Sequence, residues 1–381
     1  MNFGGEMMDR IKRYMVLHQK DILRDIQYLV ERDSPSLDKG LVDACEQRIQ
    51  KLFLKYFGYK AEELKEEKYG NHLRFTMGKG KETILILSHF DTVWNKGDLP
   101  FKIEGNKVYG PGILDMKGGL VQAIWALKAI NDLNIKLTKK VVFLCTSDEE
   151  IGSPSSRRII EKEAKSSKFA LVTEPPVSGT GALKTGRKGS ARYFVEIKGK
   201  SAHAGNHHEL GINAIEEAAK QILFLQSLTN YDKGTTVNIG SIKGGGKLNV
   251  VPDQAVFGIN VRARTSEEQN KIDYLIKHLR PTKRGIVMKI RGGINRPPMN
   301  RNKGTKRLFK IAKKVATDLG LELTEAYVGG GSDANFTANL GVPTLDGLGA
   351  IGNGIHVKDE HILASEVPGR TALLCKLIVE L

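Results

Sequence analysis

The stretch VVFLCTSDEEIGS, residues 141–153, joins a buried strand to a crowded group of acids. Residues 141–145 form a short apolar run, which is typical of a strand that is covered on both faces. Three acids, Asp148, Glu149 and Glu150, follow almost at once. Carboxylates held this close together at the end of a buried strand repel one another. We therefore expect either water or a cation among them.

Similar apolar runs alternate with helical patterns along much of the chain. We expect strands at 82–90, 141–145 and 169–172, and helices at about 7–32, at 116–133 and from the N-cap pair Ser153-Pro154 to about 164. Short apolar strands that alternate with helices predict an α/β fold. Its sheet should be mainly parallel, with helices on both faces.

A different pattern begins near residue 190. We expect, in chain order, a strand at 190–198, a helix at 211–228, strands at 235–243 and 254–263, a helix at 267–279 and a strand at 285–292. This βαββαβ order is that of a ferredoxin-like unit, which can fold by itself. The α/β pattern then resumes. The prediction is a discontinuous α/β domain at 1–186 and 296–381 and an inserted domain at 187–295.

Composition and charge exclude several classes of protein. The formal net charge is +16, but acids are interleaved with the lysines, so we expect a basic surface that attracts small anions and no nucleic-acid partner. No apolar stretch reaches the roughly 18 residues of a membrane span, and the first residues lack the apolar core of a signal peptide. Cys45, Cys145 and Cys375 have no metal-like spacing, which predicts reduced core residues in a cytoplasmic protein.

Polar side chains follow the predicted strands, where an open α/β sheet binds its ligands. They are His89, Asp91, Asp115, Glu149, Glu150, Glu174 and His356. Taken singly, each has an ordinary explanation, since a lone histidine is usually just polar and an aspartate before a helix is usually an N-cap. Together, histidines and carboxylates suit zinc, with cobalt or manganese as alternatives. A set of five such ligands fits two divalent ions that are bridged by a shared carboxylate. One of the adjacent glutamates, Glu149 or Glu150, then stays available as a base.

Six motifs carry a resemblance to a known family. HFDTVW, GPGILDMKGG, SDEEIGS, TEPP, GKSAHAG and GGGSDA, in this order, resemble the two-zinc metallopeptidase and amidohydrolase family. That family contains carboxypeptidase G (glutamate carboxypeptidase), aminoacylase, acetylornithine deacetylase and succinyl-diaminopimelate desuccinylase, and the motifs are most similar to those of carboxypeptidase G. The resemblance covers about residue 80 to the C-terminus. It implies a zinc-exopeptidase-like catalytic domain and an inserted lid that also forms a homodimer.

The resemblance implies a role for each candidate ligand. His89 and Glu174 bind one metal ion, Glu150 and His356 bind the other, and Asp115 bridges the two.

Two further acids complete the implied catalytic set. Asp91 orients the imidazole of His89, and Glu149 is the general base that takes a proton from the attacking water and delivers it to the leaving amine. In this family the peptide bond after the bridging aspartate is often cis, which here is Asp115-Met116.

The inserted domain supplies further implied residues. His203 reaches the partner subunit's site and stabilises the oxyanion of the tetrahedral intermediate, with support from Asn249. Arg262 holds the free carboxylate of the substrate, and Arg296 contacts a second anionic group. The ordinary alternative for Arg262 is an exposed basic residue on a strand.

The implied activity is hydrolysis of an amide bond next to a free carboxylate, as in a carboxypeptidase that releases a C-terminal amino acid such as glutamate. Gly330 and Gly331 would let the backbone approach the substrate closely. An N-acyl-amino-acid deacylase is the alternative, and Glu at position 174 leans towards acyl-amino-acid hydrolases over di- and tripeptidases. A non-catalytic binding protein on the same fold is a third possibility. The segment LKTGRKGSARY, residues 183–193, departs from carboxypeptidase G, so a folate-glutamate substrate is not implied.

Overall fold

The structure, a computed structural model, describes residues 3–381, with side chains from residue 10 onward. It divides into two compact units. The first comprises the chain up to Gly186 together with Arg301–Tyr327 and Ser332–Leu381, and the second comprises Arg187–Asn300 and Val328–Gly331. Each unit has its own hydrophobic core, as expected for a chain longer than about 250–300 residues.

A six-stranded sheet forms the centre of the first unit. Its strand order is β1-β2-β6-β3-β7-β14, in which β6, β3, β7 and β14 run parallel and β2 is antiparallel to both of its neighbours, β1 and β6. The strands are β1 (Glu62–Leu64), β2 (His72–Met77), β3 (Thr83–His89), β6 (Lys140–Thr146), β7 (Phe169–Val172) and β14 (Thr344–Leu345). The predicted mainly parallel sheet is confirmed.

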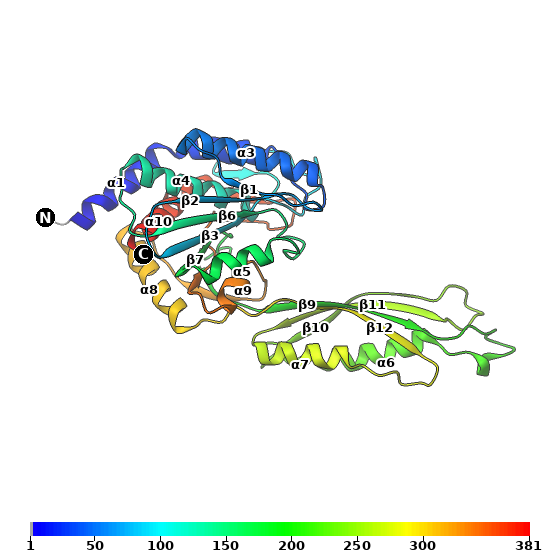
Figure 1. Ribbon diagram of the computed structural model, residues 1–381. Helices are drawn as coiled ribbons and strands as arrows, with labels where there is room; N and C mark the ends of the chain where they lie inside the picture. Colours follow the sequence, from blue (N-terminus) through cyan, green and yellow to red (C-terminus); the bar gives the residue numbers. More distant parts are fainter. Residues whose placement is uncertain (1–2) are drawn as a thin grey trace. The chain divides into compact units, whose positions relative to one another are not determined.

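Helices cover both faces of this sheet. Figure 1 shows α3, α4 and α10 on one face and α5 and α9 on the other. All seven residues of β3 are buried, so both faces of the strand need cover. The helices of the unit are α1 (Phe3–Leu17), α2 (Gln19–Val30), α3 (Lys39–Phe57), α4 (Gly118–Asp132), α5 (Arg157–Lys165), α8 (Lys303–Asp318), α9 (Ala334–Asn339) and α10 (Val367–Glu380).

Two helix predictions need correction. The pattern over 7–32 is two helices, α1 and α2, because the backbone at His18 leaves the helical conformation. The helix predicted from Ser153 begins only at Arg157. Ser153 has a φ of +58°, and its hydroxyl donates to Asp333 instead of capping a helix. The carboxylate of Asp148 accepts the nearby backbone N–H groups instead.

Two smaller sheets bring distant parts of the first unit together. One has the order β15-β16-β5-β4 and joins residues 102–109 to the C-terminal region. Its strands are β4 (Lys102–Glu104), β5 (Lys107–Tyr109), β15 (Gly352–Asn353) and β16 (His361–Leu363). The other pairs β8 (Leu183–Arg187) with β13 (Glu325–Val328). The first of these places the loop after β5 beside the loop between β15 and β16.

The second unit has the predicted βαββαβ order of elements. They are β9 (Gly189–Lys198), α6 (Ala214–Gln226), β10 (Thr236–Gly244), β11 (Gln254–Ala263), α7 (Ser266–Lys277) and β12 (Val287–Arg296). The strands are antiparallel in the order β10-β11-β9-β12. Alternate residues of β9, among them Tyr193 and Val195, enter the core, and α6 and α7 lie against one face of the sheet (Figure 1).

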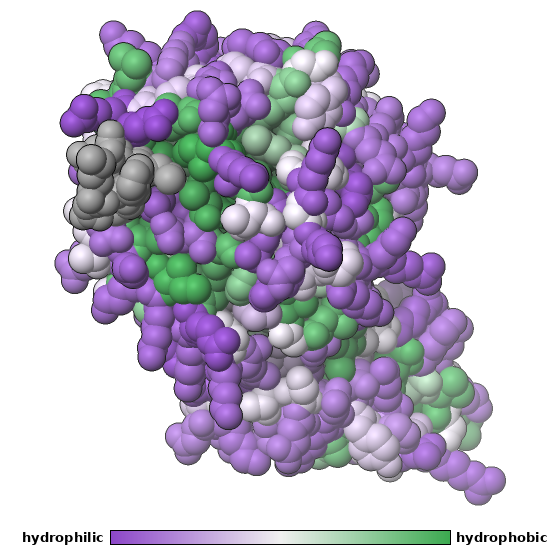
Figure 2. All heavy atoms as spheres, turned by 60° about the vertical axis from the view of Figure 1, so that its left-hand side comes forward, coloured by the Kyte–Doolittle hydropathy of each residue, from purple (hydrophilic) through white to green (hydrophobic). Residues whose placement is uncertain are grey.

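The surface and the cysteines agree with the composition. Hydrophilic side chains cover most of the face seen in Figure 2, with hydrophobic ones in smaller groups between them. Within the described residues, none of the helices has the length and apolar character to cross a bilayer. Cys45, Cys145 and Cys375 are buried and form no disulfide, as predicted.

We predict that Phe53→Ala lowers the free energy of unfolding of the first unit by about 3–5 kcal/mol, because it removes a fully buried aromatic side chain. Phe53 of α3 stacks on Phe75 of β2 with ring centroids 4.4 Å apart, so it fixes the helix to the sheet. Both tryptophans, Trp94 and Trp125, belong to the first unit, so fluorescence in urea follows that unit alone.

The control for this prediction is Lys51→Ala, an exposed position on the same helix, which should change the stability by less than about 0.5 kcal/mol. An equally small effect of Phe53→Ala would mean that the aromatic cluster does not hold α3 in place.

Candidate metal centre

Three neighbouring parallel strands end at one edge of the first sheet. β3 ends at His89, and parallel pairing aligns His89 with the last residue of β6. On the other side of β3, β7 ends two residues before Glu174. Glu149 and Glu150 follow β6 in a turn. The parallel register therefore delivers a histidine and three carboxylates to the edge where such sheets bind ligands.

Asp115 reaches the same place from a loop and is not a helix cap. α4 begins only at Gly118, and the Asp115-Met116 peptide bond is cis, as the family resemblance implied. The helix approaches the sheet closely here, since a Cβ on Gly119 would lie 2.0 Å from the carbonyl oxygen of Thr173. Only glycine allows this contact. It packs the first turn of α4 against the residue that precedes Glu174.

The first group of ligand atoms comes from His89, Asp115 and Glu174. The Nε2 atom of His89 lies 3.1 Å from Oδ1 of Asp115 and 3.6 Å from Oε1 of Glu174. The other ring nitrogen, Nδ1, lies 3.0 Å from the carbonyl oxygen of Asp91. Since a carbonyl oxygen only accepts hydrogen bonds, Nδ1 donates to it, and Nε2 is the nitrogen that would bind a metal ion.

The second group shares Asp115 with the first. The Nε2 atom of His356 lies 3.4 Å from Oδ2 of Asp115 and 3.3 Å from Oε1 of Glu150. His356 has a φ of +61° in the loop between β15 and β16. In each group all three potential ligand atoms lie within 4.8 Å of one another. The two oxygens of Asp115 thus face one histidine each, which is the arrangement expected of a bridging carboxylate.

Asp91 connects the histidine of the first group to the turn after β6. It is fully buried. Its two carboxylate oxygens accept the backbone N–H groups of Glu149, at 3.1 Å, and Glu150, at 3.2 Å. The hydroxyl of Ser36 also donates to it, at 2.7 Å. One buried aspartate therefore fixes the orientation of His89 and the position of both glutamates.

Glu360 is a second buried acid, and it holds the loop that carries Asp115 in place. Its carboxylate accepts the backbone N–H groups of Gly112, Leu114 and Asp115, at 2.9–3.1 Å, and the indole N–H of Trp94, at 2.6 Å. Glu360 is only 1% exposed. Burial raises the pKa of this carboxyl group, but four donors satisfy its oxygens.

The crowded carboxylates and imidazoles shift one another's pKa values. Burial and the Asp115 carboxylate raise the pKa of Glu150 to about 8. Hydrogen bonds to Asp115 and Glu150 raise the pKa of His356 to about 10. Burial acts to lower the pKa of His89, but its contacts with three carboxylates hold it well above the usual value. Protons thus compensate the negative charge where no cation does, and a divalent ion would replace them.

The donor set fits two divalent cations. Each group has one imidazole nitrogen and carboxylate oxygens, a mixture that suits zinc and also accommodates manganese or cobalt. The shared carboxylate matches two-metal hydrolytic sites, where ions about 3.5–4 Å apart act on one substrate. The buried hydrogen bonds to Asp91 and Glu360 provide the outer support that such ligands require. The predicted ligands of both ions are therefore together in the first unit.

Glu149 lies beside the second group without belonging to it. Its backbone is fixed by Asp91, its side chain is partly exposed, and its charge contributes to the raised pKa of Glu150. The turn that carries it is further held by Asp333 of the GGGSDA motif, which accepts hydrogen bonds from Ser153 and from Thr146.

The remaining predicted residues belong to the second unit, and His203 is held in one tautomer there. Its Nδ1 atom accepts the backbone N–H groups of Gly205, at 3.1 Å, and Asn206, at 3.0 Å, so the proton is on Nε2. Asn249 is next to it, because its carbonyl oxygen accepts the N–H of Ala204 at 3.0 Å.

Arg262 and Arg296 flank the same residue of the second sheet, since both pair with Ser190 of β9. Arg262 donates to Oδ1 of Asn260 at 3.2 Å and makes no ion pair within the described part of the chain. Burial lowers its pKa, and so do the nearby charges of Arg192 and Arg296. The combined positive charge of these guanidinium groups would attract an anion.

The two glycines of the predicted substrate site make hydrogen bonds of their own. The carbonyl oxygens of Gly330 and Gly331 accept hydrogen bonds from Nη1 of Arg187, at 3.1 and 3.2 Å.

Two residues that hold the site were not predicted. Glu360 stands among charged residues in HVKDEH, and nothing in that segment distinguishes it from a surface acid. Ser36 lies in ERDSPS, which only indicates the end of a helix. Both act through contacts with residues that are distant in the sequence, so only the fold identifies them.

Comparisons with known proteins agree with this geometry. The sequence pattern of peptidase family M20/M25/M40 matches residues 85–380. Carboxypeptidase G2 of Pseudomonas sp. (strain RS-16) is 35% identical over 317 residues, which are 80% of this chain and 75% of that protein. A succinyl-diaminopimelate desuccinylase of Stenotrophomonas maltophilia (strain R551-3) is 26% identical over 373 residues, which are 93% of this chain and 97% of that protein.

The fold also matches solved structures. One is the YXEP protein of Bacillus subtilis, described as a dinuclear metal binding peptidase of the M20 family, with a TM-score of 0.67 at 17% identity over 96% of this chain and 98% of that one. The family match covers most of the chain, and the two ligand groups share Asp115. The chain therefore belongs to peptidase family M20/M25/M40 and is a metal-dependent hydrolase.

Proposed function

We propose that this chain is a carboxypeptidase-like hydrolase, which cleaves the amide bond next to a free carboxylate and releases a C-terminal amino acid such as glutamate. The observation that carries the proposal is the pair of ligand groups that share Asp115, with Glu149 beside them. The 35% identity to carboxypeptidase G2 supports the choice of reaction.

Glu149 is the general base of the proposed reaction. The two ligand groups would hold two divalent ions, zinc as the first choice, which would polarise the amide carbonyl group and lower the pKa of water. Glu149 takes a proton from the attacking water and later delivers it to the nitrogen of the leaving amine, so the proton is conserved over the cycle. The hydrogen bond from its backbone N–H to Asp91 keeps it in place for both transfers.

Arg262 binds the free carboxylate of the substrate in this proposal. It makes no ion pair in the described chain, and two further guanidinium groups act on it, so an incoming carboxylate relieves their repulsion. The planar guanidinium suits a carboxylate. Arg296 lies next to it and contacts a second anionic group of the substrate.

His203 donates a hydrogen bond to the oxyanion of the tetrahedral intermediate. The tautomer supports this role, because the proton on Nε2 is the donor that an oxyanion requires. Asn249 supports the segment that carries it. As part of the same proposal, the second unit forms a homodimer and His203 serves the site of the partner subunit.

An N-acyl-amino-acid deacylase is the second candidate function. The observation in its favour is the likeness to a succinyl-diaminopimelate desuccinylase over 93% of this chain. The same ligands and the same base serve both reactions, so the difference lies in which part of the substrate is recognised.

A substrate panel tests the proposal. It contains N-acyl-L-glutamates, their α-carboxamides, N-acetyl-amino acids, acetylornithine, succinyl-diaminopimelate and dipeptides, each with zinc, manganese, cobalt or a chelator. We predict metal-dependent release of glutamate, with kcat/KM about tenfold or more above that of the α-carboxamides, because the carboxamide loses a charge-assisted hydrogen bond. Faster release from N-acetyl-amino acids would favour the deacylase, and no turnover with both metals bound would contradict both functions.

The matched variants for this panel are Arg262→Ala and Arg264→Ala, which lie two residues apart at and after the end of β11. Arg262→Ala should abolish the preference for the free carboxylate. Arg264→Ala should keep it, because its side chain is exposed and is not part of the proposed anion site.

We predict that Glu149→Gln lowers kcat by about 10²–10⁴-fold while the metal content stays that of the unmodified enzyme, because the amide cannot accept the proton of water. The measurements are steady-state kinetics and metal analysis of the same preparations. Glu82→Gln, an exposed acid at the opposite end of β3, serves as the control and should change neither. An unaltered kcat in Glu149→Gln would exclude this residue as the base.

A further inference from the structure

A cavity of about 520 Å³ lies within the first unit, away from the metal ligands. Its walls come from the loop before β8, the turn after α8, the strands β15 and β16, and the start of α10. Much of the lining is apolar, from Leu321, Ile351, Leu363 and Leu373. The size and the mixture of apolar walls with a few polar groups are those of a small-molecule site.

Three charged side chains line this cavity, namely Arg370, Glu366 and the exposed Glu322. Arg370 of α10 is 4% exposed and lines it together with Glu366, which directly precedes that helix. Burial lowers the pKa of Arg370 to about 10, and the Glu366 carboxylate acts in the opposite direction. The two charges therefore influence each other, yet within the described residues neither forms an ion pair at 4.0 Å or less. A buried guanidinium and a carboxylate thus remain available to one ligand.

The guanidinium is only partly used by the protein. Its Nε atom donates to the carbonyl oxygen of Gly349 at 3.2 Å, and Nη2 donates to that of Gly347. The remaining nitrogen, Nη1, has no hydrogen-bond partner in the described chain. Nη1 is therefore the nitrogen of this guanidinium that can form a charge-assisted hydrogen bond with a ligand carboxylate.

We infer that this cavity binds a free α-amino acid with an apolar side chain. The carboxylate of the ligand pairs with Arg370, its ammonium group pairs with Glu366, and its side chain contacts the leucines and Ile351. This site is separate from the one that performs hydrolysis, and its ligand belongs to the same chemical class as an amino-acid product.

The walls of the cavity are connected to both ligand groups of the metal centre. The N–H of Gly349 donates to the carbonyl oxygen of Glu174 at 2.9 Å. A Cβ on Gly349 would lie 2.1 Å from the carbonyl oxygen of Thr173, so this loop packs closely against the residue before Glu174. On the other side, β15 leads directly to His356. These contacts connect the cavity around Arg370 to Glu174 and His356.

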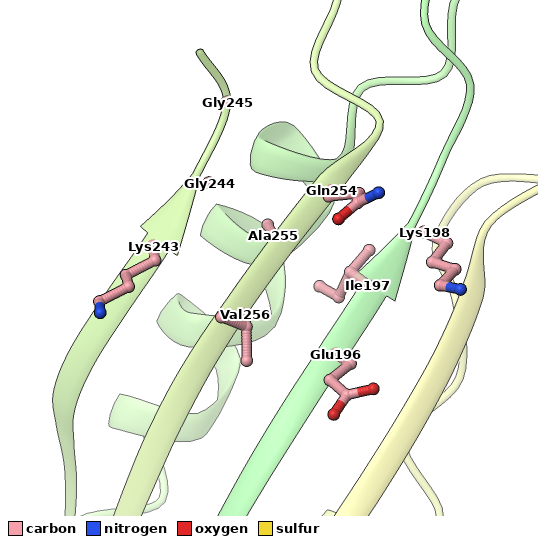
Figure 3. Close-up of a pocket in the computed structure, with 9 residues that line it drawn as sticks. All are labelled: Glu196, Ile197, Lys198, Lys243, Gly244, Gly245, Gln254, Ala255 and Val256. Carbon is pink, nitrogen blue, oxygen red and sulfur yellow. The ribbon is translucent and has the colours of Figure 1, made fainter.

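A hollow in the second unit carries no comparable pair of charges. It measures about 400 Å³ and lies at the ends of β9, β10 and β11, where Glu196, Lys198 and Lys243 project from the strands (Figure 3). Glu196 already pairs with Arg291 at 3.1 Å. The lysines are exposed, so this hollow lacks a buried charge to hold a ligand.

Calorimetric titration of the metal-loaded enzyme with L-leucine tests the inference. We expect saturable binding, with N-acetyl-L-leucine and L-leucinamide each weaker by about tenfold or more, because each lacks one of the two charges. Equal binding of all three compounds, or no binding of leucine, would overturn the inference. The titration requires no turnover, so its outcome is independent of the proposed hydrolytic activity.

The decisive variant is Glu366→Gln, since Arg370→Gln also removes two hydrogen bonds to a loop and can impair folding. Glu366→Gln should weaken leucine binding about tenfold and leave kcat/KM without leucine unchanged. Glu380→Gln, an acid on α10 that does not line the cavity, is the matched control and should bind leucine normally.

Kinetics test the connection to the metal centre. Leucine should change kcat in the unmodified enzyme and in Glu380→Gln, but not in Glu366→Gln at the same concentration. Leucine binding that is unchanged in Glu366→Gln would place the ligand elsewhere and overturn the site. Binding without any change in kcat would overturn the connection.

Discussion

The structure depends on one carboxylate that two histidines share. Asp115 presents Oδ1 to His89 and Oδ2 to His356, and the same ring nitrogen of each histidine also lies near a second carboxylate. Burial acts to raise the pKa of Asp115, but the hydrogen bonds from His356 and His89 lower it well below the usual value. Such an arrangement is costly without compensating positive charge, which two divalent cations held by these residues would provide.

The rest of the first unit holds this carboxylate and its neighbours in place. Parallel pairing of β6, β3 and β7 fixes the positions of His89 and Glu174 along the strand direction. Two buried acids then hold two loops in place. Asp91 accepts backbone N–H groups of the turn after β6, and Glu360 accepts those of the loop around Asp115. Neither acid is in either ligand group. The site is therefore preorganised by backbone hydrogen bonds, which leave the ligand atoms free to bind metal.

The sequence was sufficient to predict the parts that follow from local patterns. Short apolar runs predicted β3, β6 and β7, and their ends predicted the ligands because carboxyl ends of parallel strands meet at one edge. The family resemblance added the pairing of ligands and the cis bond after Asp115. The division of each ligand group between segments far apart, such as Glu150 and His356, follows from long-range packing that no local pattern contains.

The errors have the same origin. Ser153 has the residue type and position of an N-cap, but its hydroxyl donates to Asp333, which lies 180 residues away in the sequence. Glu360 resembles a surface acid until β16 pairs with β5 and buries it beside the Asp115 loop. In both cases a tertiary hydrogen bond outweighs the local preference, so these roles become visible only in the folded chain.

The most direct test of the account is the number of metal ions bound by variants of the shared ligand. Metal analysis would compare the unmodified chain with Asp115→Ala, Glu174→Ala and His356→Ala after dialysis, with circular dichroism to verify folding. If Asp115 bridges two ions, its removal should release both, whereas Glu174→Ala and His356→Ala should each release one of them. Retention of two ions per chain in a folded Asp115→Ala variant would contradict the shared-carboxylate account.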